Sequence, residues 1–164
     1  MITQIRPATH ADLAEVMAIY AIARDHMFHP GNASQWAGGY PSEALIVEEI
    51  EAGHSFVCEN EEGVTVGTFC LIQGEDPTYE KIYDGEWLNH RPYATVHRIA
   101  SSGKEKGVAK ACIAWCFTQC PNIRVDTHRD NRAMQHILAS LGFTYCGIIF
   151  VSNGTERMAY QKTW

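Results

Sequence analysis

The sequence lacks any run of about 18 apolar residues, the length that a membrane-spanning helix needs. Residues 1–6 also lack the apolar core of a secretory signal. Basic side chains are not in excess, because 13 Lys and Arg face 19 Asp and Glu, for a formal net charge of −6. A phosphate backbone attracts basic surfaces, so this balance argues against a nucleic-acid partner. We therefore expect a cytoplasmic protein that binds neither membranes nor nucleic acids.

The six cysteines lack the C-x2-C pairs of structural zinc sites. Cys112, Cys116 and Cys120 recur every four residues, a spacing that places them on one stripe of a helix. Thiols persist in a reducing compartment, and cysteine is among the most buried residue types. We therefore predict that this stripe packs in a core, with metal binding or redox chemistry as the alternative, and we predict no metal site.

Apolar sequence is present in the amount that a folded domain needs. The chain has 164 residues, of which 46% are hydrophobic and 20% charged, with no repeat, low-complexity segment or evident linker. A chain of this length can bury about 70% of its unfolded surface and needs no disulfide or metal. We expect one domain over residues 1–164.

Apolar periodicity and turn residues predict alternating strands and helices. The predicted strands are residues 2–6, 55–59, 65–71, 95–100, 123–127, 144–150 and 156–161. The predicted helices are one that Thr9 caps and that extends to about residue 26, followed by 41–52, 107–119 and 131–140. The order β α α β β β α β α β β predicts an α/β fold with a mixed sheet, antiparallel at first, and a β-α-β unit in its second half.

A glycine-containing loop between a predicted strand and a predicted helix is the most informative segment. Gly103 and Gly107 lie in this loop, and Lys104, Lys106 and Lys110 place three positive charges around it. Unpaired N–H groups at a helix N-terminus, together with the helix dipole, favour a bound anion, and glycine lets a phosphate approach closely. The alternative is an ordinary strand–helix turn with solvated lysines. The spacing matches neither a Walker loop nor a dinucleotide fingerprint.

Downstream of this loop, Asn131 opens a predicted helix that Gly142-Phe143 closes. Together with the loop 104–109, whose sequence is Lys-Glu-Lys-Gly-Val-Ala, these residues resemble the GNAT superfamily of acetyl-CoA-dependent N-acetyltransferases. The family loop reads Q/R-x-x-G-x-G/A, with Lys104 here in place of Gln or Arg. The resemblance implies the GNAT-type α/β (α+β) fold, a mixed and mostly antiparallel sheet flanked by helices, with a splay between the fourth and fifth strands.

The resemblance also implies acetyl-CoA as the cofactor. The loop backbone would hold the pyrophosphate, the preceding strand would bind the pantetheine arm and polarise the acetyl carbonyl, and the helix that Asn131 opens would hold the pantetheine. The implied cofactor-binding residues are Ile99, Ala100, Ser101, Lys104, Glu105, Lys106, Gly107, Val108, Ala109, Lys110, Asn131 and Met134.

The implied reaction transfers acetyl to a primary amine of a small molecule, an amino acid or a peptide, by direct attack in a ternary complex. The attacking ammonium must first lose a proton, and histidine is suited to accept it near neutral pH. His97, on the strand of the implied acetyl site, and His128, at the end of the next strand, are the candidate bases. Leu138 stands where many members carry a tyrosine as general acid, and Tyr145, Tyr160 and Cys146 are candidate substitutes, of which we select Tyr145.

Substrate contacts are expected from the irregular segments 27–40 and 74–93, where aromatic and acidic residues suit an ammonium-bearing acceptor. The candidates are Trp36, Tyr40, Tyr79, Trp87 and, as a structural or carboxylate contact, Arg98. Packing of these loops onto the domain, or a homodimer interface, is the alternative role. Two other functions stay open: a protein N-terminal or lysine acetyltransferase, and a non-catalytic acyl-CoA-binding sensor or interaction module, which Leu138 favours.

Overall fold

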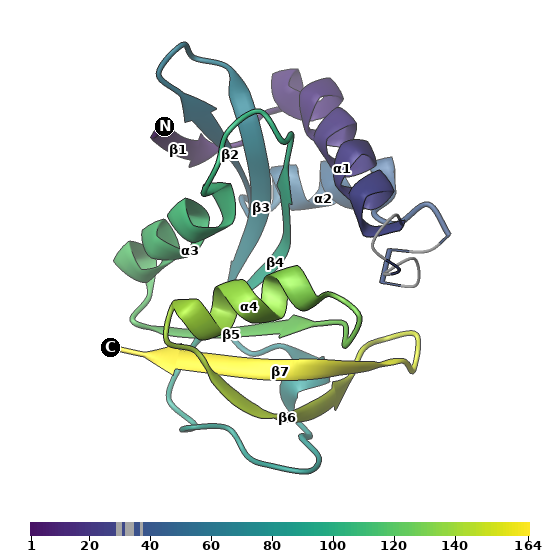
Figure 1. Cartoon of the computed structure of the whole chain (residues 1–164), viewed down its shortest axis with the longest axis vertical. Helices are drawn as coiled ribbons and strands as arrows, with labels where there is room; N and C mark the ends of the chain where they lie inside the picture. Colours follow the sequence, from purple (N-terminus) through teal and green to yellow (C-terminus); the bar gives the residue numbers. More distant parts are fainter. Residues whose placement is uncertain (29–30, 32–34, 37) are drawn as a thin grey trace. The chain divides into compact units, whose positions relative to one another are not determined.

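Every stretch predicted as a strand forms one in the computed structural model, which describes residues 1–28, 31, 35–36 and 38–164 (Figure 1). The strands are β1 (Ile2–Pro7), β2 (Ser55–Asn60), β3 (Thr65–Gln73), β4 (Ala94–Ser101), β5 (Asn122–Thr127), β6 (Thr144–Phe150) and β7 (Glu156–Thr163). The helices are α1 (Leu13–Phe28), α2 (Glu43–Glu51), α3 (Val108–Gln119) and α4 (Arg132–Ser140), with short 3-10 turns η1 (His10–Asp12) and η2 (Pro77–Tyr79). Predicted and observed ends differ by only a few residues, as is usual for element termini.

The strands of the described residues form one sheet in the order β1-β2-β3-β4-β5-β7-β6. β1 with β2, β2 with β3, β5 with β7 and β6 with β7 pair antiparallel. β4 and β5 pair parallel, at Ala94 with Ile123 and Thr95 with Arg124, whereas β5 pairs with β7 along its whole length. The predicted α/β class and the mixed, mostly antiparallel sheet are confirmed, and the short parallel pairing fits a separation of the fourth and fifth strands.

The chain forms two compact units. The first comprises residues 1–71 and 98–115, and the second comprises residues 72–97 and 116–164. β3, β4 and α3 contribute residues to both units. The expectation of a single domain over residues 1–164 stays a prediction.

Within the first unit, neighbouring residues of β2 face opposite layers of helix. Phe56 packs against Phe69 of β3 and Trp115 of α3, at ring-centroid distances of 5.4 and 5.0 Å. Val57 instead lies in a buried cluster with Tyr20 of α1 and Ile46 of α2. Because strand side chains alternate between faces, α1 and α2 cover one face of these strands and α3 the other (Figure 1).

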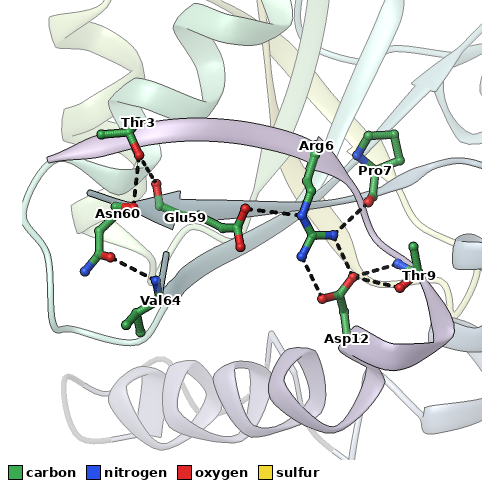
Figure 2. Close-up of polar contacts among 8 residues, drawn as sticks. All are labelled: Thr3, Arg6, Pro7, Thr9, Asp12, Glu59, Asn60 and Val64. Atoms are coloured by element: carbon green, nitrogen blue, oxygen red, sulfur yellow. Dashed lines mark hydrogen bonds and ion pairs between the residues drawn. The ribbon is translucent and has the colours of Figure 1, made fainter. Parts of the chain in front are cut away.

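Arg6 joins β1 to β2 and to the start of the first helix (Figure 2). Its guanidinium donates to both carboxylate oxygens of Asp12, at 2.8 and 2.9 Å, and to Glu59 at 3.2 Å. Asp12 also accepts from the backbone N–H of Thr9 at 2.8 Å, which is one of the two contacts of a capping box. The adjacent Arg6 guanidinium lowers the pKa of Asp12 to about 2.

Within the second unit, α4 ends at the predicted glycine. Gly142 has φ +86°, the N–H of Gly142 donates to Ala139, and the N–H of Phe143 donates to Leu138 at 3.0 Å. These bonds satisfy carbonyl groups that the helix end leaves unpaired, in the manner of a Schellman motif. Lys162 of β7 donates to the carbonyl of Leu141 at 2.6 Å, which ties the helix end to the sheet.

The long irregular segment 74–93 is packed onto the second unit. Tyr83 and Ile148 exchange both backbone hydrogen bonds at 2.8 Å, which attaches the segment to β6. A Cβ at Gly147 would lie 2.5 Å from the carbonyl oxygen of Tyr83, so glycine permits this close approach. Three of the four aromatic side chains of the segment belong to a core: Tyr79, Trp87 and Tyr93 are buried with Cys146, Ile149 and Ala159, whereas Tyr83 is exposed.

All six cysteines are buried thiols, including Cys112, Cys116 and Cys120, which confirms that their helical stripe packs in a core. Within the described ranges, no group of three or more His, Cys, Asp or Glu side chains could hold a metal ion. Among the same residues, no helix combines the length and the apolarity that crossing a bilayer would take.

Candidate functional site

Two glycines in the left-handed region shape the loop between β4 and α3. Gly103 has φ +82° and Gly107 has φ +74°, conformations that side chains disfavour. The N–H of Gly103 donates to the hydroxyl oxygen of Ser101 at 3.1 Å, and the N–H of Lys104 donates to that of Ser102 at 3.3 Å. The loop is therefore held by its own serines where it leaves the strand.

The start of α3 is a positive surface. Its first helical hydrogen bond runs from the N–H of Ala111 to the carbonyl of Gly107 at 3.0 Å. The N–H groups of the turn before Ala111 therefore take no part in the hydrogen bonds within the helix. Lys104, Lys106 and Lys110 are all exposed around this turn. Glu105 is directed away, because its carboxylate accepts from Asn60 at 3.4 Å. Helix dipole, N–H groups and three ammonium groups together favour an anion here.

Gly67 of β3 positions this helix start, and the sequence reasoning missed it. A Cβ at Gly67 would lie 2.5 Å from Cγ1 of Val108, the first residue of α3, and 3.3 Å from the carbonyl oxygen of Ala100. Glycine is required because α3 and β4 both approach β3 at this point. The sequence does contain a signal that could have identified Gly67, because a glycine inside an apolar strand often marks a close backbone approach.

Arg98 lies in the first unit next to other residues that the sequence predicts to contact substrate. Its Nη1 donates to the hydroxyl of Tyr40 at 2.8 Å, its Nη2 donates to the sulfur of Cys70 at 3.2 Å, and Nη2 lies 3.7 Å from Glu49. Trp36 packs edge-on against Tyr40 at 6.5 Å. Arg98 precedes Ile99, Ala100 and Ser101 on β4, of which Ala100 is buried and the other two are half-buried.

His97 contacts a carboxylate in the second unit. Its Nε2 lies 3.3 Å from Oδ2 of Asp76. The other oxygen of Asp76 accepts from the N–H and the hydroxyl of Thr78 at 2.9 and 2.7 Å, and the N–H of Asp76 donates to the hydroxyl of Tyr93. Burial alone would raise the pKa of Asp76, but hydrogen bonds from His97 and Thr78 lower it to about 2. Sequence reasoning missed Asp76, which no local pattern connects to His97.

Tyr79 and Trp87 lie in the core of the second unit. The hydroxyl of Tyr79 donates to Asp126 of β5 at 2.6 Å, and the indole N–H of Trp87 donates to the carbonyl of Tyr79 at 3.0 Å. Burial, with Asp126 next to it, raises the pKa of Tyr79 well above its usual range. Arg124 lies 4.0 Å from the ring centroids of both Trp87 and Tyr93. Tyr79 and Trp87, which were predicted to contact substrate, therefore lie in the core and hold the segment 74–93 onto the second unit.

His128 and Asn131 form the turn that starts α4. The Nδ1 of His128 accepts from the N–H of Asp130 at 3.0 Å, and its carbonyl accepts from the N–H of Asn131 at 2.9 Å. Asn131 caps the helix, because its side-chain oxygen accepts from the N–H of Met134 at 3.1 Å. Burial, followed by the charge of Arg157, lowers the pKa of His128.

Tyr145 lies on β6, half-exposed, with its ring 5.7 Å from that of Tyr160. Burial raises the pKa of Tyr160 and that of Cys146. Leu138 is fully buried and is a hydrocarbon, so its side chain supplies no proton. The structure thus brings His97 to Asp76 in one unit and Arg98 to Tyr40 in the other, whereas Tyr145 pairs with Tyr160.

Comparison with known proteins gives matches among solved structures, whereas no family model and no curated protein matches the sequence. A GNAT-family acetyltransferase from Streptococcus agalactiae is 34% identical, with a TM-score of 0.90 over 98% of this chain and 95% of that one. A GNAT-family acetyltransferase from Listeria monocytogenes is 21% identical, with a TM-score of 0.72 over 98% and 94%. A GNAT-superfamily phosphinothricin acetyltransferase from Sinorhizobium meliloti, solved with AcCoA, shares the fold at 18% identity, with a TM-score of 0.67 over 99% and 89%.

Proposed function

Because the chain belongs to the GNAT family of acetyltransferases, we propose that it transfers the acetyl group of acetyl-CoA to a primary amine by direct attack in a ternary complex. The observation that carries this proposal is the positive, glycine-shaped start of α3 within that fold. The acceptor class that we propose is a small molecule, an amino acid or a peptide. The AcCoA complex of the Sinorhizobium meliloti structure supports the choice of cofactor.

The first unit offers chemistry that fits the pyrophosphate of the cofactor. No described atom lies within 4 Å of a Cβ added at Gly107, so the backbone is open to a phosphate oxygen there. The three lysines around it balance the phosphate charge, and the N–H groups of Val108 and Ala109 begin a helix whose dipole favours an anion. In this proposal the strand residues 99–101 hold the pantetheine arm through their backbone. The cofactor contacts that the family resemblance implies for Asn131 and Met134, in the second unit, stay predictions.

We assign the general base to His97. With Nε2 directed at Asp76, its Nδ1 is left to accept the proton that an ammonium must lose before attack, directly or through water. The ionised Asp76 orients the ring and stabilises the imidazolium that forms. His128 is the weaker candidate because its Nδ1 already accepts the N–H of Asp130 and its carbonyl holds the α4 turn.

When bound, acetyl-CoA supplies an activated acetyl group: the amine nitrogen forms a bond to the acetyl carbon as the bond from that carbon to sulfur breaks. The nitrogen loses its second proton as the amide forms, and the departing thiolate takes up one proton, in both cases through solvent or a nearby group. The pKa of a free thiol is about 8.5, so the thiolate is a good leaving group and needs no acid at residue 138. Tyr145 stays a proposed alternative donor.

One observation favours a second candidate function. The buried Leu138 replaces the tyrosine that donates a proton in many members of the family, which fits an acyl-CoA-binding sensor without turnover. Calorimetry with acetyl-CoA and a CoA thiol-release assay with a panel of primary amines separate the two. Sustained release supports the enzyme, binding without release supports the sensor, and the absence of both rules out the proposed cofactor.

A further inference from the structure

Arg98 is a buried arginine in a strained backbone conformation. Only 9% of its side chain is exposed, and its φ of +53° lies in the left-handed region although it belongs to strand β4. A residue other than glycine adopts this conformation at a cost in free energy, and such residues concentrate at ligand sites. The surrounding structure therefore holds Arg98 in place against a local preference.

The hydrogen bonds of Arg98 leave one buried donor without an acceptor. Nη1 and Nη2 donate to Tyr40 and Cys70, but Nε is buried and has no partner within the described part of the chain. Burial raises the pKa of Cys70, so its sulfur stays a neutral thiol and balances no charge. Glu49 lies 3.7 Å from Nη2, too far for a hydrogen bond, and contacts His54 at 3.1 Å. A buried guanidinium N–H without an acceptor is unfavourable.

One hydroxyl group adds to this excess of donors. The buried hydroxyl of Tyr20 is not that group, because it already lies in hydrogen-bonding contact with Cys70 and Thr68. The hydroxyl of Tyr40 accepts from Arg98, which leaves its own proton to donate.

A cluster with two unused donors and one partly balanced positive charge suits a monoanion. A planar carboxylate matches the fork of a guanidinium, whereas a phosphate dianion would exceed the single charge that Arg98 offers. Tyr40, 38% exposed, is the member of the cluster that reaches solvent. Arg98 also directly precedes residues 99–101 of β4, to which the proposed function assigns the arm that carries the acetyl group.

We propose that the acceptor amine carries a carboxylate, as an α-amino acid does, and that Arg98 and Tyr40 bind this carboxylate. This inference rests on the proposed function for the identity of the ligand as the acetyl acceptor. The binding of the carboxylate itself is a property of the first unit and can be measured without turnover.

The test compares α-amino acids that have small, aromatic, acidic and basic side chains with the corresponding α-carboxamides, which keep the amine and the shape. Saturation-transfer NMR with CoA present measures binding, and thiol release from acetyl-CoA measures kcat/KM. We expect at least one amino acid to exceed its carboxamide by about tenfold to a hundredfold in both measurements, because hydrogen bonds to a charged group are lost in the amide.

Two variants locate the preference. Arg98→Gln is expected to bring the ratio of acid to amide close to one, and Tyr40→Phe, which removes one exposed hydroxyl, to lower it several-fold with the fold intact. Arg91→Gln is the matched control, since Arg91 is exposed and bonded to Thr163. Equal binding of acid and amide by the natural protein, or an unchanged ratio in both variants, overturns the inference. A loss of both ligands alike in Arg98→Gln assigns Arg98 a structural role and also overturns it.

The two proposals fail in different ways. Selective binding of carboxylates without thiol release from any amine would contradict the proposed enzyme and support the carboxylate site. Turnover of amines with no preference for a carboxylate would support the enzyme and contradict the site.

Discussion

The ring nitrogen Nε2 of His97 lies 3.3 Å from the carboxylate oxygen Oδ2 of Asp76, inside the second unit of the chain. The carboxylate is itself held by Thr78 and by the turn that η2 begins. A carboxylate fixed in this way sets the orientation and the tautomer of a histidine ring, which is what a general base requires.

Replacement of His97 by Gln is expected to lower kcat by about a hundredfold or more, because the amine loses its proton acceptor. Asp76→Asn, which keeps the shape but removes the charge, is expected to lower kcat less, by about tenfold, with the KM for acetyl-CoA unchanged in both variants. His10→Gln, at an exposed histidine of η1, is the control. Steady-state kinetics that show full activity in His97→Gln would remove His97 from the mechanism.

The ion pair of Arg6 and Asp12 predicts a pH-dependent stability. The pKa of Asp12 is lowered to about 2 in the folded protein, against an ordinary value of about 3.9, so the carboxylate stabilises the fold above pH 4 and loses this effect as the pH falls towards 2. We expect Asp12→Asn to reduce the free energy of unfolding by about 2 kcal/mol at pH 7 and by about half as much at pH 3.

Urea denaturation at both pH values measures this difference, with Glu61→Gln in the exposed β2–β3 turn as the control. A difference between Asp12→Asn and the natural protein that stays constant from pH 7 to pH 3 would show that the charge of Asp12 does not stabilise the fold.

Gly67→Ala is expected to weaken CoA binding about tenfold and to lower stability by about 1 to 3 kcal/mol, because the new methyl group displaces Val108 at the start of α3. The second substitution Val108→Ala removes the clashing Cγ1 atom and should restore part of the affinity in the double variant. Calorimetry with CoA tests both. Unchanged affinity in Gly67→Ala would mean that the position of the α3 start does not matter for the cofactor.

We expect replacement of Lys104, Lys106 or Lys110 by Gln to weaken CoA binding a few-fold each. Each replacement should also reduce the dependence of the affinity on salt, because salt screens exposed charges. Lys81→Gln, an exposed lysine of the second unit, should leave both unchanged. Gly107→Glu should abolish binding, since it adds a negative charge at a φ of +74°. Salt-independent binding in the natural protein would contradict this charge assignment.

Local signals account for the parts of the fold that could be predicted. The capping contact of Thr9 and Asp12, the Asn131 cap of α4 and the stop at Gly142 each involve residues within one turn of one another, so a short stretch of sequence contains both partners. The loop before α3 could be predicted for the same reason, because its glycines, its lysines and the helix start are adjacent in the chain.

The site residues that the sequence reasoning missed depend on distant partners. Asp76 and Gly67 acquire their roles from His97 and Val108, which other strands and helices bring to them. The sequence left two roles open for Tyr79 and Trp87, substrate contact or packing of their loop onto the domain, and the structure shows both residues buried in a segment docked on β6.

The sequence by itself therefore determined the order of the elements, their caps and the positive start of α3, since backbone preference and helix charge act over a few residues. Only the tertiary structure decided which side chain orients His97, that Arg98 keeps a buried N–H without a partner, and why β3 needs a glycine at residue 67. These properties arise from packing and desolvation between segments far apart in the chain, on which no local pattern carries information.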